Sequence, residues 1–159
     1  MLYLMRGLPG SGKSTWIRNN WKFREYAVLA LCADDYLMID GKYQYTPQAI
    51  IKAHDDIFRR TIIELMPPDS FGVPIQRSKY EDIVIDNTGT QLINLAPYIQ
   101  LAASFNVPYE IVYLMCDVET SIRRNTHNVP PNVIIQMNRN LLTEVIPPFW
   151  KQRVILPAA

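Results

Sequence analysis

An octapeptide close to the amino end of the chain reads Gly7-Leu8-Pro9-Gly10-Ser11-Gly12-Lys13-Ser14. It fits the pattern G-x-x-x-x-G-K-[ST] in full, and it lies between a short apolar run and a segment with helical spacing. Glycines let such a backbone curl until successive N–H groups point at phosphate oxygens, and the helix that follows adds positive potential. A glycine-rich turn without a ligand is the weaker alternative. The sequence therefore predicts a phosphate-binding loop at residues 7–14.

The last two residues of this phosphate loop have expected roles of their own. The Lys13 ammonium can reach the outer phosphates of a nucleoside triphosphate, and the Ser14 hydroxyl can ligate Mg²⁺. We therefore expect ATP and Mg²⁺ as cofactors, with Lys13 in catalysis and Ser14 as the metal ligand. The predicted nucleotide-binding residues are Gly7, Leu8, Pro9, Gly10, Ser11, Gly12, Lys13, Ser14 and Thr15.

Short apolar runs alternate with segments of helical spacing along the rest of the chain. Strands are expected at residues 2–5, 27–31, 83–85, 110–115 and 153–156. Helices are expected at residues 13–20, 47–66, 91–105, 117–125 and 132–142. Because the strands are continuous apolar runs, they favour a parallel sheet covered on both faces. The predicted fold is α/β, a P-loop kinase-type three-layer sandwich with a mostly parallel sheet of four or five strands, in a single domain of residues 1–159.

Two polar segments interrupt this pattern. Residues 40–45 are expected to form a turn, in which Tyr43 and Tyr45 could stack on a nucleobase beside Lys42, although a plain exposed turn is the favoured interpretation. Pro67 and Pro68 end the long helix, and residues 69–80 are expected to form a mobile surface loop.

The composition excludes several classes of protein. With 48% apolar residues, 19% charged residues and a net charge of +1, the chain is neither disordered nor strongly polyanion-binding, so any contact with nucleic acid must come from a local basic patch. No apolar run approaches the ~20 residues needed to cross a bilayer, so we expect a soluble, cytoplasmic protein without a membrane partner.

The cysteines and histidines match no metal-ligand or redox spacing. Cys32 and Cys116 each close an apolar run, so we expect buried free thiols and no disulfide, as in a reducing compartment. For His54 and His127 the sequence suggests no more than a surface or substrate-side position.

Charged side chains follow three of the predicted strands. In open α/β sheets ligands bind outside the carboxyl ends of the strands, so these side chains are the candidates for chemistry. Phosphoryl transfer to a hydroxyl needs a carboxylate that accepts the proton, a metal on the phosphates, and cations for the developing charge. The predicted catalytic residues are Asp34, Lys13, Arg124 and Arg123, and the predicted acceptor-binding residues are Asp35, Asp86 and Thr88.

Each of these candidates has a plainer alternative. The pair Asp34-Asp35 could form a solvated turn, although its place after the second strand favours a functional role. Asp86 could hold the metal, as the carboxylate at the end of such a strand does, or it could fasten the turn that follows, and the sequence favours neither. Arg123 and Arg124 could simply lie on a solvated helix face.

Four blocks of the sequence together resemble the polynucleotide 5′-kinase family. Within this family, the blocks most resemble the kinase domain of the bacteriophage member. They are also similar to the P-loop domain of 2′,3′-cyclic nucleotide phosphodiesterase. The resemblance runs in order along nearly the whole chain except residues 67–80. The blocks are residues 6–16, Asp34-Asp35-Tyr36, Ile85-Asp86-Asn87-Thr88, and Arg123-Arg124-Asn125 followed by Val129-Pro130.

This resemblance implies ATP-dependent phosphorylation of the 5′-hydroxyl end of DNA or RNA, as in nucleic-acid repair. It makes Asp34 the general base and Arg124 a lid cation over the phosphates. The chain departs from the phage enzyme at Leu37, where that enzyme has an arginine for the acceptor's 3′-phosphate, and at Asn87-Thr88-Gly89, where that enzyme has Asp-Thr-Asn. A second lid arginine is also missing after Asn125. These departures leave the acceptor open.

Two rival functions follow from the same residues. The chain could be a kinase for a nucleoside, a nucleotide or another small metabolite. It could also be a nucleotide-binding module without catalysis, acting as a scaffold or regulator. Transfer of labelled phosphate from ATP to an oligonucleotide, to a mononucleoside or to neither separates the three.

Overall fold

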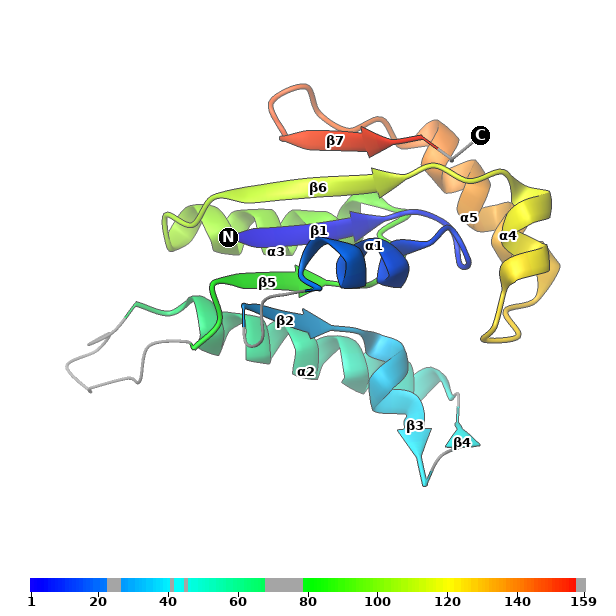
Figure 1. Ribbon diagram of the computed structural model, residues 1–159, viewed down its shortest axis with the longest axis horizontal. Helices are drawn as coiled ribbons and strands as arrows, with labels where there is room; N and C mark the ends of the chain where they lie inside the picture. The colour runs from blue at the N-terminus through cyan, green and yellow to red at the C-terminus, as the bar shows by residue number, and fades with distance from the viewer. Residues whose placement is uncertain (23–26, 41, 45, 68–78, 157–159) are drawn as a thin grey trace.

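The computed structural model describes the chain except residues 23–26, 41, 45, 68–78 and 157–159. Within the described residues, five parallel strands form one sheet in the order β2-β5-β1-β6-β7 (Figure 1). The strands are β1 (Leu2–Arg6), β2 (Val28–Leu31), β5 (Asp82–Ile85), β6 (Tyr109–Leu114) and β7 (Gln152–Ile155). The predicted α/β fold with a parallel sheet is therefore confirmed.

Helices cover both faces of this sheet, with α1 on one face and α2 and α3 on the other (Figure 1). The α-helices are α1 (Lys13–Asn20), α2 (Pro47–Leu65), α3 (Leu92–Ser104), α4 (Val118–Arg124) and α5 (Pro131–Thr143). The helix α2 begins as the sequence predicts, because the Thr46 hydroxyl accepts a hydrogen bond from the Ala49 amide at 3.0 Å and Pro47 takes the first helical position.

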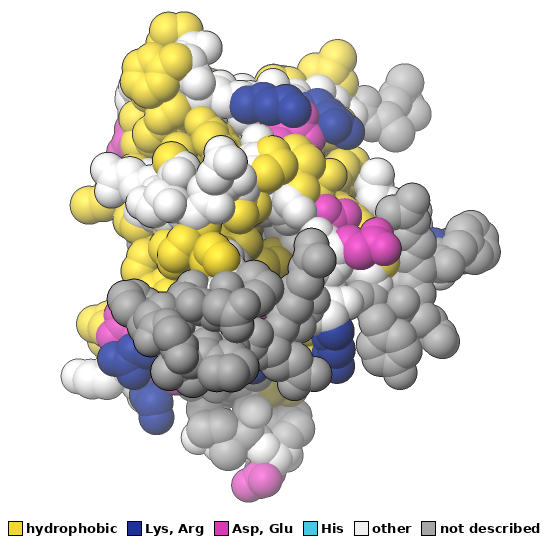
Figure 2. Space-filling view, turned by 90° about the vertical axis from the view of Figure 1, so that its left-hand side faces the viewer, with side chains coloured by type: hydrophobic (Ala, Val, Ile, Leu, Met, Phe, Trp, Pro, Cys, Tyr) yellow, Lys and Arg dark blue, Asp and Glu magenta, His cyan; other side chains and the backbone are white. Residues whose placement is uncertain are grey.

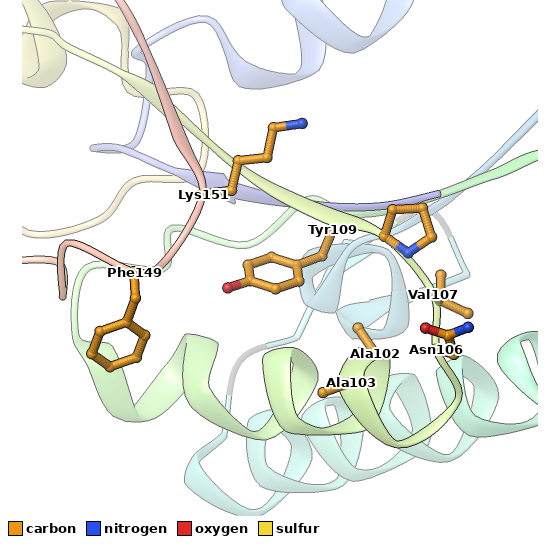
Figure 3. A pocket seen from close by; sticks show the side chains of 8 residues that line it. Ala102, Ala103, Asn106, Val107, Tyr109, Phe149 and Lys151 are labelled. Atoms are coloured by element: carbon orange, nitrogen blue, oxygen red, sulfur yellow. The ribbon is translucent and has the colours of Figure 1, made fainter.

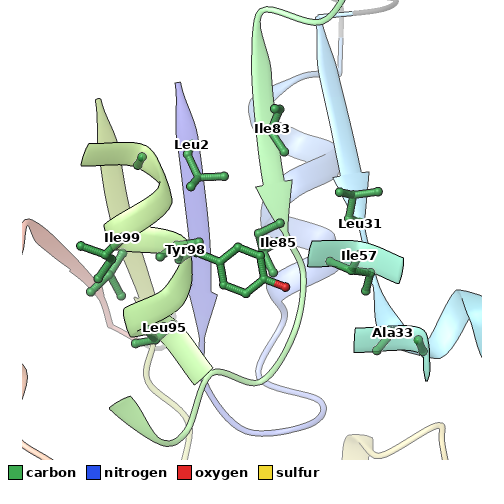
Figure 4. Close-up of a cluster of buried hydrophobic side chains, with 13 residues drawn as sticks. Leu2, Leu31, Ala33, Ile57, Ile83, Ile85, Leu95, Tyr98 and Ile99 are labelled. Carbon is green, nitrogen blue, oxygen red and sulfur yellow. The ribbon is translucent and has the colours of Figure 1, made fainter. Parts of the chain in front are cut away.

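The alternation of side chains along β1 divides the core into two layers. Leu2 and Leu4 pack towards α2 and α3, in a cluster that includes Ile57 and Tyr98 (Figure 4). Met5 faces the opposite way and packs with α1. Since successive strand residues point to opposite faces, a run that is apolar at every position is what a sheet covered on both sides requires.

Two short elements differ from the expectation of loops and turns. Residues 33–37 form a 3₁₀ helix, η1 (Ala33–Leu37), directly after β2. The predicted turn at residues 40–45 is partly a hairpin, in which β3 (Met38–Ile39) pairs with β4 (Lys42–Tyr43). The predicted stacking of Tyr43 and Tyr45 beside Lys42 concerns side chains outside the described part of the structure. The predicted loop at residues 69–80 also lies outside the described residues, except its last two residues.

The strand order places the end of β1 at a switch point of the sheet. From β1 the chain first builds β2 and β5 on one side, and then crosses to β6 and β7 on the other. Ligands of open α/β sheets bind at such a point, outside the carboxyl ends of the strands. In Figure 1 this edge lies on the right, with η1, α4 and α5 around it.

The amino ends of the strands form the opposite end of the molecule, which faces the viewer in Figure 2 and is largely hydrophobic in the part described. A pocket of about 420 Å³ lies between the end of α3 and the segment before β7. Tyr109 and Phe149 extend towards it, and Lys151 is its charged lining residue (Figure 3). No helix among the described residues is long and apolar enough to span a membrane.

Candidate active site

The phosphate loop is shaped by glycines that touch the backbone of its neighbours. Gly7 has a φ of 145°, and a side chain there would meet the Leu114 carbonyl oxygen at 2.6 Å. The Gly7 amide donates to the Thr88 carbonyl at 2.8 Å, which ties the loop to the segment after β5. The Leu8 side chain is buried against Ile134 of α5, so its predicted role in nucleotide binding falls to its main chain.

Lys13 lies inside the curl of the loop. Its Nζ donates to the carbonyls of Gly7 at 3.1 Å and Leu8 at 2.8 Å, and the side chain is 9% exposed. Burial lowers the pKa of Lys13, and the nearby carboxylate of Asp86 partly offsets this. A buried ammonium that is hydrogen-bonded to neutral carbonyls gains charged hydrogen-bond partners when it exchanges them for phosphate oxygens.

Ser14 and Asp86 form the second pair of the site. The Ser14 hydroxyl donates to Asp86 Oδ2 at 2.8 Å, across the gap between the start of α1 and the end of β5. The other carboxylate oxygen, Oδ1, is buried and has no hydrogen-bond partner among the described residues. Burial raises the pKa of Asp86, against the opposing effects of the Ser14 hydrogen bond and Lys13. An orphaned carboxylate oxygen beside a hydroxyl fits Mg²⁺, which binds one or two carboxylates together with phosphate oxygens.

The neighbours of Asp86 bear on the role that the sequence left open. Asn87, and not Asp86, fastens the segment after β5, because its Oδ1 accepts a hydrogen bond from the Ala33 amide at 3.1 Å. Thr88 contributes its carbonyl to the loop. The Asp86 carboxylate is hydrogen-bonded to the Ser14 hydroxyl instead.

The helix α4 packs directly on the phosphate loop. The buried Ser121 hydroxyl donates to the Pro9 carbonyl at 2.7 Å, and a side chain at Gly10 would lie 3.0 Å from Arg124 Cβ. Arg124 therefore stands beside the loop, as a lid cation must. Arg123 is directed along the helix, since its Nη2 donates to Thr120 Oγ1 at 3.1 Å.

Asp34 and Asp35 are brought to the same edge by η1. The charge of Asp34 acts on the pKa values of both Lys13 and Asp86, so its carboxylate belongs to the same electrostatic site. Leu37, three residues further on, is 1% exposed and offers no contact to an acceptor. Of the other predicted residues, Thr15 is exposed and its Oγ1 accepts a hydrogen bond from Arg18.

Sequence reasoning gave His127 no definite role, yet it lies at this site. Its Nε2 is 3.9 Å from Asp34 Oδ2. The one sequence signal for this placement is its position three residues after Arg124, in the segment that follows α4. Cys32, directly after β2, is also near, and burial raises the pKa of its thiol to about 11.

No family model matches the chain. The chain is similar to NEDD4-binding protein 2 of Homo sapiens, with 31% identity over 143 residues, which is 86% of this chain but 7% of that protein. The chain thus corresponds to a small part of this curated relative.

Solved structures with a similar fold include a protein of an RNA repair complex and a gluconokinase. The chain is similar to a protein in the Pnkp1/Rnl/Hen1 RNA repair complex (TM-score 0.65, 19% identity, 89% of this chain and 43% of that one). It is also similar to Chaetomium thermophilum Kti12 in complex with ADP-AlF3 (TM-score 0.65, 14% identity, 99% of this chain and 89% of that one). A third similar structure is a gluconokinase from Sinorhizobium meliloti (TM-score 0.57, 15% identity, 99% of this chain and 82% of that one). The described residues have the P-loop kinase fold.

Proposed function

We propose that this chain, acting as one domain, is an ATP- and Mg²⁺-dependent phosphotransferase whose acceptor is the 5′-hydroxyl end of a nucleic acid. The observation that carries the proposal is the meeting of three groups at one edge of the sheet. These are Lys13 in the phosphate loop, the Ser14–Asp86 pair, and the Asp34 carboxylate. A nucleotide site alone needs the first two, whereas transfer to a hydroxyl also needs the third.

Each residue has a role in the proposed reaction. The acceptor oxygen attacks the γ-phosphorus of ATP, the bond from that phosphorus to the β–γ bridging oxygen breaks, and the acceptor proton passes to Asp34. Lys13 and Arg124 stabilise the negative charge that develops on the transferred group. Ser14 and Asp86 would hold Mg²⁺, which neutralises charge on the outer phosphates when bound.

The nucleic-acid acceptor is supported by two resemblances. The four sequence blocks resemble polynucleotide 5′-kinases, and one structural neighbour is part of an RNA repair complex. A small-metabolite acceptor is the second candidate, because Leu37 is buried and one neighbour is a gluconokinase. The two candidates differ in the acceptor and share the catalytic residues.

An acceptor panel with γ-labelled ATP and Mg²⁺ tests the proposal. We expect label on 5′-hydroxyl RNA or DNA oligonucleotides and none on matched oligonucleotides that already carry a 5′-phosphate. Label on nucleosides or sugars alone would favour the metabolite kinase. Tight binding of ATP without transfer to any hydroxyl would contradict the kinase and favour a binding module.

A further inference from the structure

The segment between α4 and α5 forms a turn that is held by side-chain hydrogen bonds. Asn125 Nδ2 donates to the Val129 carbonyl at 2.8 Å, and Asn125 Oδ1 accepts a hydrogen bond from the His127 amide at 3.3 Å. Asn128 has a φ of 54°, in the left-handed region that asparagine tolerates. Val129 packs in the cluster around Leu8 of the phosphate loop. The backbone of His127 is therefore fixed with respect to that loop.

His127 meets Asp34 from the other side of the site. The side chains of His127 and Asp34 are 48% and 37% exposed, so both are accessible to solvent and hence to an acceptor. The separation of 3.9 Å between Nε2 and Oδ2 is too long for a hydrogen bond and suits an ion pair. Such a contact is strongest when the imidazole is protonated.

The chain has two histidines, and both act on this carboxylate. His54 lies on α2, where burial lowers its pKa while Asp34 and Asp55 act in the opposite direction. The charged groups that interact with Asp34 from the elements around it are thus Lys13 on α1, Asp86 after β5 and His54 on α2, while Asp35 is its neighbour on η1 and Arg123 and Arg124 end α4, the helix before His127. A test of His127 must therefore be separated from any effect of His54.

We infer that His127 is a positioning residue for Asp34. Its imidazolium attracts one carboxylate oxygen, Oδ2, and so turns the other, Oδ1, towards the acceptor hydroxyl. The inference rests on the proposed phosphotransfer and adds a residue that neither the phosphate loop nor the catalytic carboxylate reveals. It joins the nucleotide side of the site, through the turn on α4, to the acceptor side on η1.

The test compares the wild-type chain with His127→Ala and His127→Gln at pH 6 and pH 8. The substrates are γ-labelled ATP with Mg²⁺ and a 5′-hydroxyl RNA oligonucleotide. Because exposed ion pairs are weak and only a protonated imidazole attracts a carboxylate, we expect kcat of the wild type to exceed that of His127→Ala by about fivefold at pH 6 and by less than about twofold at pH 8. Groups that titrate in both chains cancel in this ratio. The KM for ATP should not change.

Two further variants make the assignment specific. Glutamine can donate a hydrogen bond but does not titrate, so the rate of His127→Gln relative to His127→Ala should be the same at both pH values. The ratio of the His54→Ala kcat to the His127→Ala kcat should change between pH 6 and pH 8 as the wild-type ratio does. Thermal unfolding of each variant shows whether the half-exposed turn still folds normally.

The opposing outcomes separate the inference from the proposed function. If the ratio of the wild-type kcat to the His127→Ala kcat were equal at both pH values, the role of His127 would be overturned. The same would follow if His54→Ala, and not His127→Ala, abolished the pH dependence of kcat. Either result would leave the proposed kinase activity intact. A wild-type chain that transfers phosphate to no acceptor would overturn the proposed function and this inference with it.

Discussion

At the scale of single residues, burial sets the charges of the site. It lowers the pKa of Lys13 and raises the pKa of Asp86, so that each group depends on the other, or on a ligand, to remain charged. Shifts of this kind gather at functional sites, where stability is given up for reactivity. The phosphates of a nucleotide would relieve the first cost, and a divalent cation would relieve the second.

Asp34 carries the first prediction. Replacing Asp34 by Asn keeps its size and removes the base, so kcat should fall at least about 100-fold, since general-base catalysis contributes 10²–10⁴. The affinity for Mg·ATP, measured by calorimetry, should stay within about twofold because Asp34 is placed on the acceptor side. Asp35→Asn is the matched control, and we expect it to change the acceptor KM more than kcat. A wild-type rate in Asp34→Asn would show that another group takes the proton.

Cys32 carries a prediction about pH. Burial raises the pKa of its thiol from 9.0 to about 11. Little thiolate is then present at pH 8, and even allowing for the greater nucleophilicity of a more basic thiolate, iodoacetamide should react at least about tenfold more slowly than with the unfolded chain. The native protein holds this proton more tightly than the unfolded chain does, so the free energy of unfolding should fall as pH rises from 9 to 11. Alkylation of Cys32 as fast as in urea would contradict the partial burial of its thiol.

The sequence revealed the residues of this site unevenly. Lys13 and Ser14 follow from a local pattern, because one loop holds both. The orientation of the Asp86 side chain towards Ser14 could not be predicted, because it depends on Asn87, and not Asp86, accepting the hydrogen bond from η1. His127 could not be predicted either, because its meeting with Asp34 joins residues 93 apart along the chain.

At the scale of elements, the docking of α4 on the phosphate loop is the decisive contact. It joins the helix that carries Arg124 to the glycine-rich loop at residues 7–14, through the Ser121–Pro9 hydrogen bond and the close approach at Gly10. The loop and the helix should therefore move as one unit.

Gly10→Ala tests this contact. The new side chain would press on Arg124 Cβ at 3.0 Å and on the Ser121 carbonyl at 3.1 Å. Gly12→Ala is the matched control, because Gly12 also has a positive φ, 96° against 69°, but its nearest neighbour would be Leu114 Cδ2 at 3.9 Å. Overpacking costs about 1–3 kcal/mol, so Gly10→Ala should lower the free energy of unfolding in urea by that much more than Gly12→Ala. Equal losses in the two variants would mean that α4 does not rest on the loop.

The long helices and the main strands were predictable because their apolar spacing is local and their ends carry clear signals, such as Thr46-Pro47. The short elements were not. The η1 turn spans five residues and is held by a hydrogen bond that the Ala33 amide donates to the distant Asn87 side chain, and the hairpin after it has two residues in each strand. Tertiary contacts of this kind leave no periodic signal in the sequence.

At the scale of the whole molecule, the sequence predicts a parallel sheet but not the order of its strands. The β1 strand pairs with β5 and β6, whose partner residues lie about a hundred positions away, as in Leu2 opposite Ile83 and Tyr109. This order puts the phosphate loop at the switch point, and it brings the ends of β2, β5 and β6 around it. The site is thus a product of topology, and each strand end supplies one part of it.

Calorimetric titration with Mg·ATP tests the central claim, that the loop and Lys13 bind the phosphates of a nucleotide. For the wild-type chain we predict binding at one site per chain. For Lys13→Ala we predict an affinity weaker by at least about 100-fold, because a charge-assisted hydrogen bond to phosphate from a buried ammonium is worth roughly 3 kcal/mol. A wild-type chain that binds no Mg·ATP, or a Lys13→Ala variant that binds it equally well, would contradict the account.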